Sequence, residues 1–394
     1  MTSHERILTS LNHTQPDRVA VDFGGHRSSG IMAIAYNNLK KHLGIDTGDI
    51  YIYDMMQQLA VIEPEILDHF EIDTVELGRG FMTEDSEWKE WVLPDGTPCK
   101  IPAYMELEKQ GDDWLLLNKA GKPIFIQKKG SLYFEQMFYP YLDCDLGAHD
   151  FSDLEEALDE LSGLPTPGDH FSLDEVGLKR LTAGAAALRN STDRAIIGLF
   201  GGNMFELGQV LFRMDNFLLH QMMYPDAIHL FLEKVCDLHL ANLEKWLTAV
   251  GPYIDVVLFG DDFGGQSGPL ISSDMYREFY KPLQKKLWTR AKEIADVKVQ
   301  LHSCGGIEIF LDDFIENGLD AVNPVQFSSR GMDSQFLKQK YGGRFTLWGG
   351  GCDTQSVLPA ATPAAIKEHV KKQLDVLAPD GDFIFQQVHN IMAN

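Results

Sequence analysis

A His-x-Cys pair, formed by His302 and Cys304, directly follows an apolar, β-rich run in the segment VKVQLHSCGG. Side chains two positions apart leave the same face of an extended chain, so these two groups can reach one point. Cys352 offers a second thiol in the segment LWGGGCD, just past another apolar run. Imidazole and thiol groups are ligands of catalytic zinc, which typically keeps three protein ligands and an open fourth position. The pattern therefore predicts a zinc site formed by His302, Cys304 and Cys352, with Gln326 as a candidate weak fourth ligand.

The alternative interpretation is that both cysteines are simply small buried hydrophobic residues, as cysteine often is. Two observations favour the metal site. Both cysteines stand beside glycines, where the backbone can pass close to a ligand. The pattern of the whole chain also predicts a fold whose catalytic residues lie at the ends of its strands.

Short apolar runs alternate with amphipathic segments along most of the chain. The predicted strands are Val19–Phe23, Thr74–Leu77, Ala195–Phe200, Val256–Phe259, Val297–Leu301, Ala321–Val322, Phe345–Trp348 and Phe383–Val388. The predicted helices are Ile31–Leu43, Pro64–Phe70, Leu173–Arg189, Asp226–Ala249, Ser273–Ile294, Ile307–Asn317 and Thr362–Leu377. This alternation predicts a parallel (β/α)8 barrel of the TIM type, with an open doubly wound sheet as the alternative.

The stretch Glu84–Tyr141 breaks the alternation. It is rich in tryptophan and tyrosine, and runs such as WKEWVL, DDWLLLN and KPIFIQKK are separated by turn sequences such as Pro94-Asp95-Gly96. Such runs are typical of antiparallel hairpins. We therefore expect residues 1–394 to form one barrel domain, with a β-hairpin insertion over residues 84–141 between its second and third strands.

In such barrels the catalytic groups gather at the carboxyl ends of the strands. Polar side chains follow nearly every predicted strand. The predicted catalytic residues are Asp261, Asp262 and His389, and the predicted substrate-binding residues are His26, Arg27, Asn203, Gln326 and Asn390. Structural roles are the alternatives: Asp261 would satisfy loop amides, His26 and Arg27 would be surface groups, and His389 would be a core histidine.

Composition excludes several classes of protein. The 394 residues are 44% apolar and 23% charged, which is ordinary for a globular enzyme. No run approaches the length of a membrane span, and the N-terminus lacks the apolar core of a signal peptide, so a cytoplasmic protein is expected. A net charge of −24 opposes binding to nucleic acid. Five cysteines, an odd number, favour reduced thiols or metal ligands over disulfides.

Several segments resemble the uroporphyrinogen decarboxylase superfamily, in its zinc-dependent, corrinoid-linked methyltransferase branch. They cover nearly the whole chain and read ERILTSLNHTQPDRVAV, FGDDFGGQSGPLISSDMYREFYKP, LHSCGGIEIFLDDFIENGLDAVNPVQ and FIFQQVHNI. The second and third are the most specific. In that branch a His-x-Cys pair and a distant cysteine bind zinc, and these positions map onto His302, Cys304 and Cys352.

Two departures from the family pattern matter. The decarboxylase itself binds a carboxylate-rich tetrapyrrole with an arginine-containing N-terminal motif and needs no metal. The corresponding segment here, DFGGHRSSGI, holds the single arginine Arg27, which argues against that activity. The family also continues past the HNI segment into another helix, so either the barrel lacks its closing helix or the chain is a piece of a longer protein.

The resemblance implies a zinc-dependent methyltransferase that moves a methyl group from a small methoxylated, aromatic substrate to a corrinoid protein, as in an O-demethylase. The aromatic insertion favours this donor side. The cobalamin would be carried by a partner protein, because the chain has no Asp-x-His-x-x-Gly sequence. The alternatives are transfer from the methylated corrinoid protein to a thiol such as coenzyme M, a metal-free uroporphyrinogen-type decarboxylase, and a non-catalytic corrinoid-binding module with a structural zinc.

Overall fold

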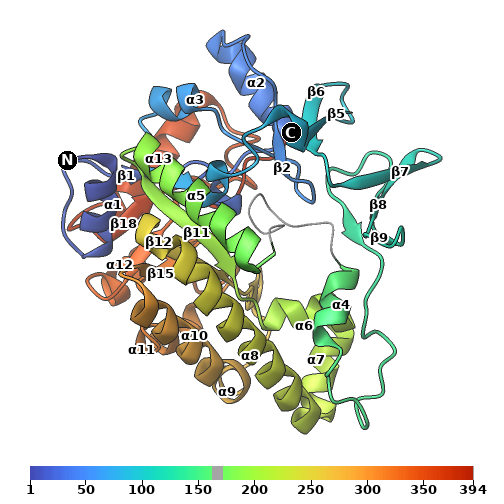
Figure 1. The fold of residues 1–394 in the computed structure, drawn as a ribbon. Coiled ribbons are helices and arrows are strands. Elements are labelled where there is room, and N and C mark those ends of the chain that lie inside the picture. Colours follow the sequence, from blue (N-terminus) through green and yellow to red (C-terminus); the bar gives the residue numbers. More distant parts are fainter. Residues whose placement is uncertain (162–171, 394) are drawn as a thin grey trace.

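The computed structural model describes residues 1–161 and 172–393 and contains a barrel of parallel strands surrounded by helices (Figure 1). The barrel strands are β1 (Ala20–Val21), β4 (Thr74–Glu76), β11 (Ala195–Gly201), β12 (Val256–Gly260), β15 (Lys298–His302), β16 (Ala321–Asn323), β17 (Thr346–Trp348) and β18 (Phe383–Phe385). They are hydrogen-bonded in the order β1-β18-β17-β16-β15-β12-β11-β4, and all neighbours are parallel.

The two strands at the ends of this order also meet. The backbone N–H of Asp73 donates to the carbonyl of Val21 at 2.8 Å, and the N–H of Val21 donates to the Asp73 carboxylate at 2.8 Å. The sheet therefore closes, and the predicted (β/α)8 barrel is confirmed, whereas the open doubly wound sheet is wrong. Every predicted barrel strand is present, and four of them, β1, β4, β17 and β18, are shorter than the apolar runs that predicted them.

Helices cover the outside of the barrel. They are α1 (Ser3–Leu11), α2 (Ala33–Leu43), α3 (Pro64–His69), α4 (Leu154–Glu160), α5 (Glu175–Ser191), α6 (Phe205–Phe212), α7 (Met214–Met223), α8 (Pro225–Val250), α9 (Ser273–Met275), α10 (Lys281–Ile294), α11 (Leu311–Glu316), α12 (Ser334–Tyr341) and α13 (Pro363–Leu377). Short 3-10 turns are η1 (Arg27–Ser29), η2 (Leu77–Gly80), η3 (Asp85–Glu87), η4 (Gly251–Tyr253) and η6 (Glu308–Phe310), and η5 (Tyr276–Tyr280) is a π-helical turn between α9 and α10.

Several helices begin at a capping side chain. The side chain of Ser272 accepts the N–H of Met275 at the start of α9, and Asp333 accepts the N–H of Phe336 at the start of α12. Such bonds satisfy N–H groups that have no partner within the helix. Helices α4, α6, α7 and α12 were not predicted from the sequence. Between α6 and α7 the chain turns sharply at Arg213, whose φ is +70°.

The stretch between β4 and β11 contains antiparallel strands. These are β5 (Trp88–Val92), β6 (Pro98–Pro102), β7 (Glu106–Gln110), β8 (Asp113–Leu117), β9 (Pro123–Gln127) and β10 (Glu135–Gln136). The first two form a hairpin and the others a sheet in the order β10-β9-β8-β7, on one side of the barrel in Figure 1. Smaller hairpins are β2 (Ile52–Asp54) with β3 (Leu59–Ala60) and β13 (Gly264–Gly265) with β14 (Gly268–Pro269).

Helix α1 closes one end of the barrel. Its residues Ile7 and Leu11 belong to the same buried cluster as Leu258 and Trp348, from barrel strands. The carbonyl of Ser10 accepts the hydroxyl of Thr346, the first residue of β17, so α1 covers the amino ends of the strands. The carboxyl ends are therefore left to form a site. No helix in the described part of the chain is long and apolar enough to cross a membrane.

Candidate metal centre

Three possible metal ligands converge at the carboxyl ends of β15 and β18. His302 is the last residue of β15, Cys304 follows it by two positions, and His389 lies in the loop after β18. Their ligand atoms all lie within 4.8 Å of one another, and the Nε2 atom of His302 is 3.4 Å from the Sγ atom of Cys304. The ring centroids of the two histidines are 6.0 Å apart. A single ion could contact all three side chains.

A tight turn holds Cys304 at this point. The following Gly305 has φ of +82°, and a Cβ atom there would lie 2.3 Å from the backbone carbon of Gly264. Only glycine fits such a close approach at a positive φ. Gln326 supports the same turn, because its Oε1 atom accepts the N–H of Gly305 at 2.8 Å. The glycine beside the cysteine thus serves to bring two backbone segments together.

An amide oxygen fixes the orientation of His302. The Nδ1 atom of His302 lies 2.9 Å from Oδ1 of Asn323, whose Nδ2 donates to Oε1 of Gln386 at 2.7 Å and to the carbonyl of Trp348 at 3.1 Å. These acceptors assign Nδ2 as the donor, so Oδ1 must accept. His302 then carries its proton on Nδ1 and presents the lone pair of Nε2 toward Cys304.

His389 is held in the same way. Its Nδ1 atom lies 2.8 Å from Oδ1 of Asn390, and Nδ2 of Asn390 donates to Oε1 of Gln57 at 2.5 Å. Metal-binding histidines almost always donate their second ring N–H to such an acceptor, which fixes the tautomer and the ring orientation. Two imidazoles prepared in this manner, beside one thiol, fit the ligand preferences of zinc.

Burial sets the charge of these groups. It lowers the pKa of both His302 and His389, so both imidazoles are neutral near pH 7, as metal ligands must be. Burial raises the pKa of the Cys304 thiol well above its usual range, and the nearby Asp262 and Glu206 raise it further. The protein alone therefore keeps this sulfur protonated, and a bound cation would favour the thiolate.

The two predicted catalytic aspartates have different surroundings. Asp262 accepts the N–H of Cys304 at 2.7 Å, and its Oδ1 atom is 3.6 Å from Nε2 of His302. Asp261 is buried, and its oxygens accept the N–H groups of Met204 and Glu206 at the start of α6. Burial raises the pKa of Asp261 to about 7. The contacts of Asp261 are those of a helix cap, the structural alternative weighed for it, whereas Asp262 adjoins the candidate ligands.

A cavity of about 550 Å³, here called the mouth cavity, opens beside this group. Its lining includes the predicted residues His26, Arg27, Asn203, Asp262, His302 and His389. Gln326 and Asn390 are not among the described residues that line it. Asn390 contacts the lining residue His389, and Gln326 bonds the turn at Gly305. Arg27 pairs with Asp54 at 3.2 Å. His26 is only 1% exposed, so the surface-group alternative is wrong for His26.

The predicted third ligand, Cys352, is placed differently from the other two. Its buried Sγ atom lies 3.9 Å from the carbonyl of Asp353 and does not belong to the converging group. Its backbone carbonyl nevertheless accepts the N–H of Val388, the residue before His389, at 2.8 Å. The structure therefore brings together two of the three predicted ligands, adds His389, and holds the main chain of Cys352 alongside. The zinc itself stays a prediction.

Two mouth residues were missed by sequence reasoning. Glu206 in α6 accepts Nδ2 of Asn203 at 2.6 Å, and burial together with Asp262 and Asp261 raises its pKa well above the usual range. His239 in α8 bonds the carbonyl of Asn203 at 2.9 Å, and burial lowers its pKa. Both lie on helices, so the rule that searches strand ends could not find them. The one sequence signal for Glu206 was its position three residues past Asn203, which was itself a predicted substrate-binding residue.

Replacing Asn390 with leucine is expected to weaken zinc binding by about 10–100-fold, because His389 would lose the acceptor that orients it. Competition with a coloured chelator measures this affinity. The control is Asn38→Leu, at an exposed position of α2. Unchanged zinc affinity in Asn390→Leu would show that His389 is not a ligand.

A parallel α/β barrel whose strand ends gather imidazole, thiol and carboxylate groups at a cavity has the architecture of a barrel enzyme. The chain belongs to the uroporphyrinogen decarboxylase family, because the model described as "Uroporphyrinogen decarboxylase (URO-D)" matches residues 174–394, more than half of its length. The family resemblance seen in the sequence is confirmed. No match was found among curated proteins.

Solved structures support the fold. The chain is similar to a methyltransferase from Methanosarcina mazei, with a TM-score of 0.57 and 16% identity over 99% of this chain and 94% of that chain. A 7,8-dihydropteroate synthase from Vibrio fischeri aligns with 39% of this chain and 54% of that chain at 14% identity. Its TM-score of 0.26 is too low to indicate a shared fold. At 16% identity the first similarity shows a shared fold over nearly the whole chain.

Proposed function

We propose that this protein is a zinc-dependent methyltransferase that moves a methyl group from a small methoxylated, aromatic substrate to a corrinoid protein. The observation that carries the proposal is the convergence of His302, Cys304 and His389 at the mouth of the barrel, with each imidazole held by an amide oxygen. The resemblance to a methyltransferase over nearly the whole chain supports it. The reverse direction, toward a thiol, uses the same site and is the second candidate.

The residues around the candidate metal centre have different roles in this proposal. His302, Cys304 and His389 would hold the zinc, which when bound polarises a substrate oxygen or lowers the pKa of a thiol. Asp262 holds the backbone of Cys304 through its N–H and keeps a negative charge beside His302.

A proton for the departing oxygen needs a different group. His389 is one of the predicted catalytic residues, but burial lowers its pKa and leaves that imidazole neutral. Glu206 lines the mouth cavity, and burial raises its pKa well above the usual range, which favours its protonated form. In this proposal Glu206 supplies the proton.

The charges of the mouth cavity argue against the decarboxylase alternative. Its lining holds one arginine, Arg27, which already pairs with Asp54, beside the carboxyl groups of Glu206 and Asp262. A carboxylate-rich tetrapyrrole would find too few cations there to bind its carboxylates. An uncharged methoxylated substrate needs no such cations.

The direct test measures methyl transfer by the zinc-loaded protein to cob(I)alamin from a panel of methoxyarenes. Transfer from methylcobalamin to coenzyme M is measured in parallel, and the inactive-site control is Cys304→Ser. We expect transfer from at least one methoxyarene. Transfer only to the thiol would reverse the direction. Decarboxylation of uroporphyrinogen by metal-free protein, with no methyl transfer, would contradict the proposal.

Replacing Asp262 with asparagine is expected to leave zinc content near normal while lowering turnover by about 10–100-fold. Asparagine can still accept the N–H of Cys304, but the negative charge beside His302 is lost. Elemental analysis and the methyl-transfer rate are measured on the same sample. The control is Asp375→Asn, at an exposed position of α13. Loss of metal in step with activity would instead make Asp262 a ligand.

A further inference from the structure

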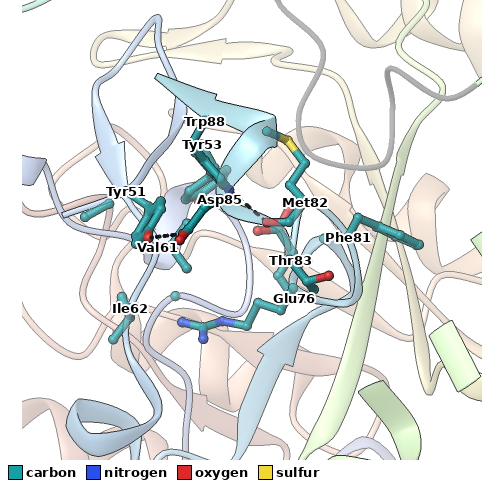
Figure 2. A pocket seen from close by; sticks show the side chains of 14 residues that line it. Tyr51, Tyr53, Val61, Ile62, Glu76, Phe81, Met82, Thr83, Asp85 and Trp88 are labelled. Carbon is teal, nitrogen blue, oxygen red and sulfur yellow. Dashed lines mark hydrogen bonds between the residues drawn. The ribbon is translucent and has the colours of Figure 1, made fainter. Parts of the chain in front are cut away.

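A second cavity, of about 350 Å³, lies where η2, the β2–β3 hairpin and the start of β5 meet (Figure 2). It shares no lining residue with the mouth cavity. Its apolar walls include Tyr51, Ile62, Phe81, Met82 and Trp88, which Figure 2 labels. Its volume and largely apolar lining are those of a small-molecule pocket. Nothing in the proposed methyl transfer uses this cavity.

Two buried polar groups at this cavity lack a hydrogen-bond partner among the described residues. They are the Nη2 atom of Arg79 and the hydroxyl of Tyr53, and both residues line the cavity. Tyr53 is 5% exposed, so water does not satisfy its hydroxyl freely. Buried polar groups are nearly always paired in folded proteins, and each exception calls for an explanation. A ligand with an acceptor atom would pair both donors.

The charges of this second cavity indicate the charge of that ligand. Arg79 and the buried Glu76 both line it, and they interact electrostatically. The remaining lining carboxylate, Asp85, is exposed at the rim, where it accepts the hydroxyl of Tyr51 at 3.5 Å. The interior therefore holds one group of each sign. An anion would be repelled by Glu76 and a cation by Arg79, whereas an uncharged polar group can contact both.

We infer that this cavity binds an uncharged aromatic molecule whose amide or hydroxyl group accepts hydrogen bonds from Arg79 and Tyr53 and donates one to Glu76. The flat ring would lie among Tyr51, Phe81 and Trp88. The site shares no lining residue with the mouth cavity, and the Arg27–Asp54 ion pair links the two, because Arg27 lines the mouth cavity and Asp54 follows Tyr53 in β2. The inference does not depend on the proposed methyl transfer.

The first experiment compares three probes of similar size with the 394-residue chain, before and after zinc removal by EDTA. Benzamide carries the uncharged acceptor and donor, benzoate carries a charge, and toluene carries neither. Dissociation constants come from saturation-transfer NMR titrations. We expect benzamide to bind at least threefold more tightly than benzoate or toluene, with or without metal. Tighter binding of benzoate, or no binding of benzamide up to its solubility limit, would overturn the inference.

The second experiment tests the two unpaired donors. Arg79→Lys keeps the positive charge but removes Nη2, and Tyr53→Phe removes only the hydroxyl. Each is expected to weaken benzamide binding about threefold to tenfold, as the loss of one hydrogen bond does. The control is Tyr253→Phe, in η4 and away from the cavity. Equal affinity in both variants and the control would refute the site.

Tyr53→Phe also separates binding from folding. Because the hydroxyl has no partner in the free protein, its removal should leave the melting temperature unchanged or raise it. The variant therefore decides the question even where Arg79→Lys folds poorly. A fall in melting temperature without a change in benzamide affinity would assign the Tyr53 hydroxyl a structural role and overturn the inference.

Discussion

Replacing Cys304 with serine is expected to reduce bound zinc from about one ion per chain to a small fraction of that amount. Cys304 is the one thiol in the group of converging ligand atoms. A hydroxyl is a much poorer ligand for zinc than a thiolate, so the affinity should fall by more than the roughly 10–100-fold typical of losing a supporting contact. Methyl transfer should be lost together with the metal.

Elemental analysis of protein purified with added zinc measures the first effect, and the matched control is Cys144→Ser, a partly exposed cysteine elsewhere. Two further variants decide the third ligand. His389→Ala should lose zinc if the ligands are those that the structure brings together, and Cys352→Ser should lose it if they are those that the sequence pattern indicates. Full zinc content in Cys304→Ser would show that Cys304 is not a ligand and would contradict the proposed metal centre.

Replacing Asp22 with asparagine is expected to lower the free energy of unfolding by about 3–5 kcal/mol, as when one partner of a buried ionic network is removed. Asp22 is 1% exposed at the end of β1. One oxygen accepts the N–H of Gly25 and the hydroxyls of Ser29 and Thr74, and the other accepts the indole N–H of Trp348 and adjoins His26. Whichever of these two oxygens the asparagine NH2 group replaced, it would face hydrogen-bond donors and could not accept their hydrogens.

The effect should also depend on pH. Burial would raise the pKa of Asp22, but His26 and its other hydrogen-bond donors outweigh this and hold that pKa below its ordinary value. A carboxyl group with a lowered folded-state pKa adds stability at neutral pH, and this stability is lost as the pH falls through the lowered value. Asp22→Asn should therefore approach the wild type in stability as the solution becomes strongly acidic.

Urea denaturation at several pH values measures both effects of the Asp22 substitution. The control is Asp46→Asn, at an exposed position, which should change the free energy of unfolding by less than about 0.5 kcal/mol. A change of similar size in both variants would mean that Asp22 does not hold the barrel end together, and that its five neighbours find partners elsewhere.

The sequence by itself determined the barrel architecture and the closeness of His302 and Cys304. Barrel strands such as β11 and β12 are largely buried runs of apolar residues, and that pattern is local, so it can be read along the chain. The His-x-Cys spacing is local too, because two side chains on one extended segment share a face whatever surrounds them. His302 and Cys304 are for this reason adjacent in the structure.

Only the tertiary structure decided which distant groups join them. His389 reaches the centre because β18 and β15 point the same way in a closed barrel, and no periodicity in the sequence states where a loop side chain then turns. The same holds for Asp22, which bonds Trp348 across 326 positions, and for Glu206, which reaches the mouth cavity from a helix. Contacts between remote segments depend on strand order and side-chain rotamers, and these are set by packing of the whole chain rather than by any local pattern.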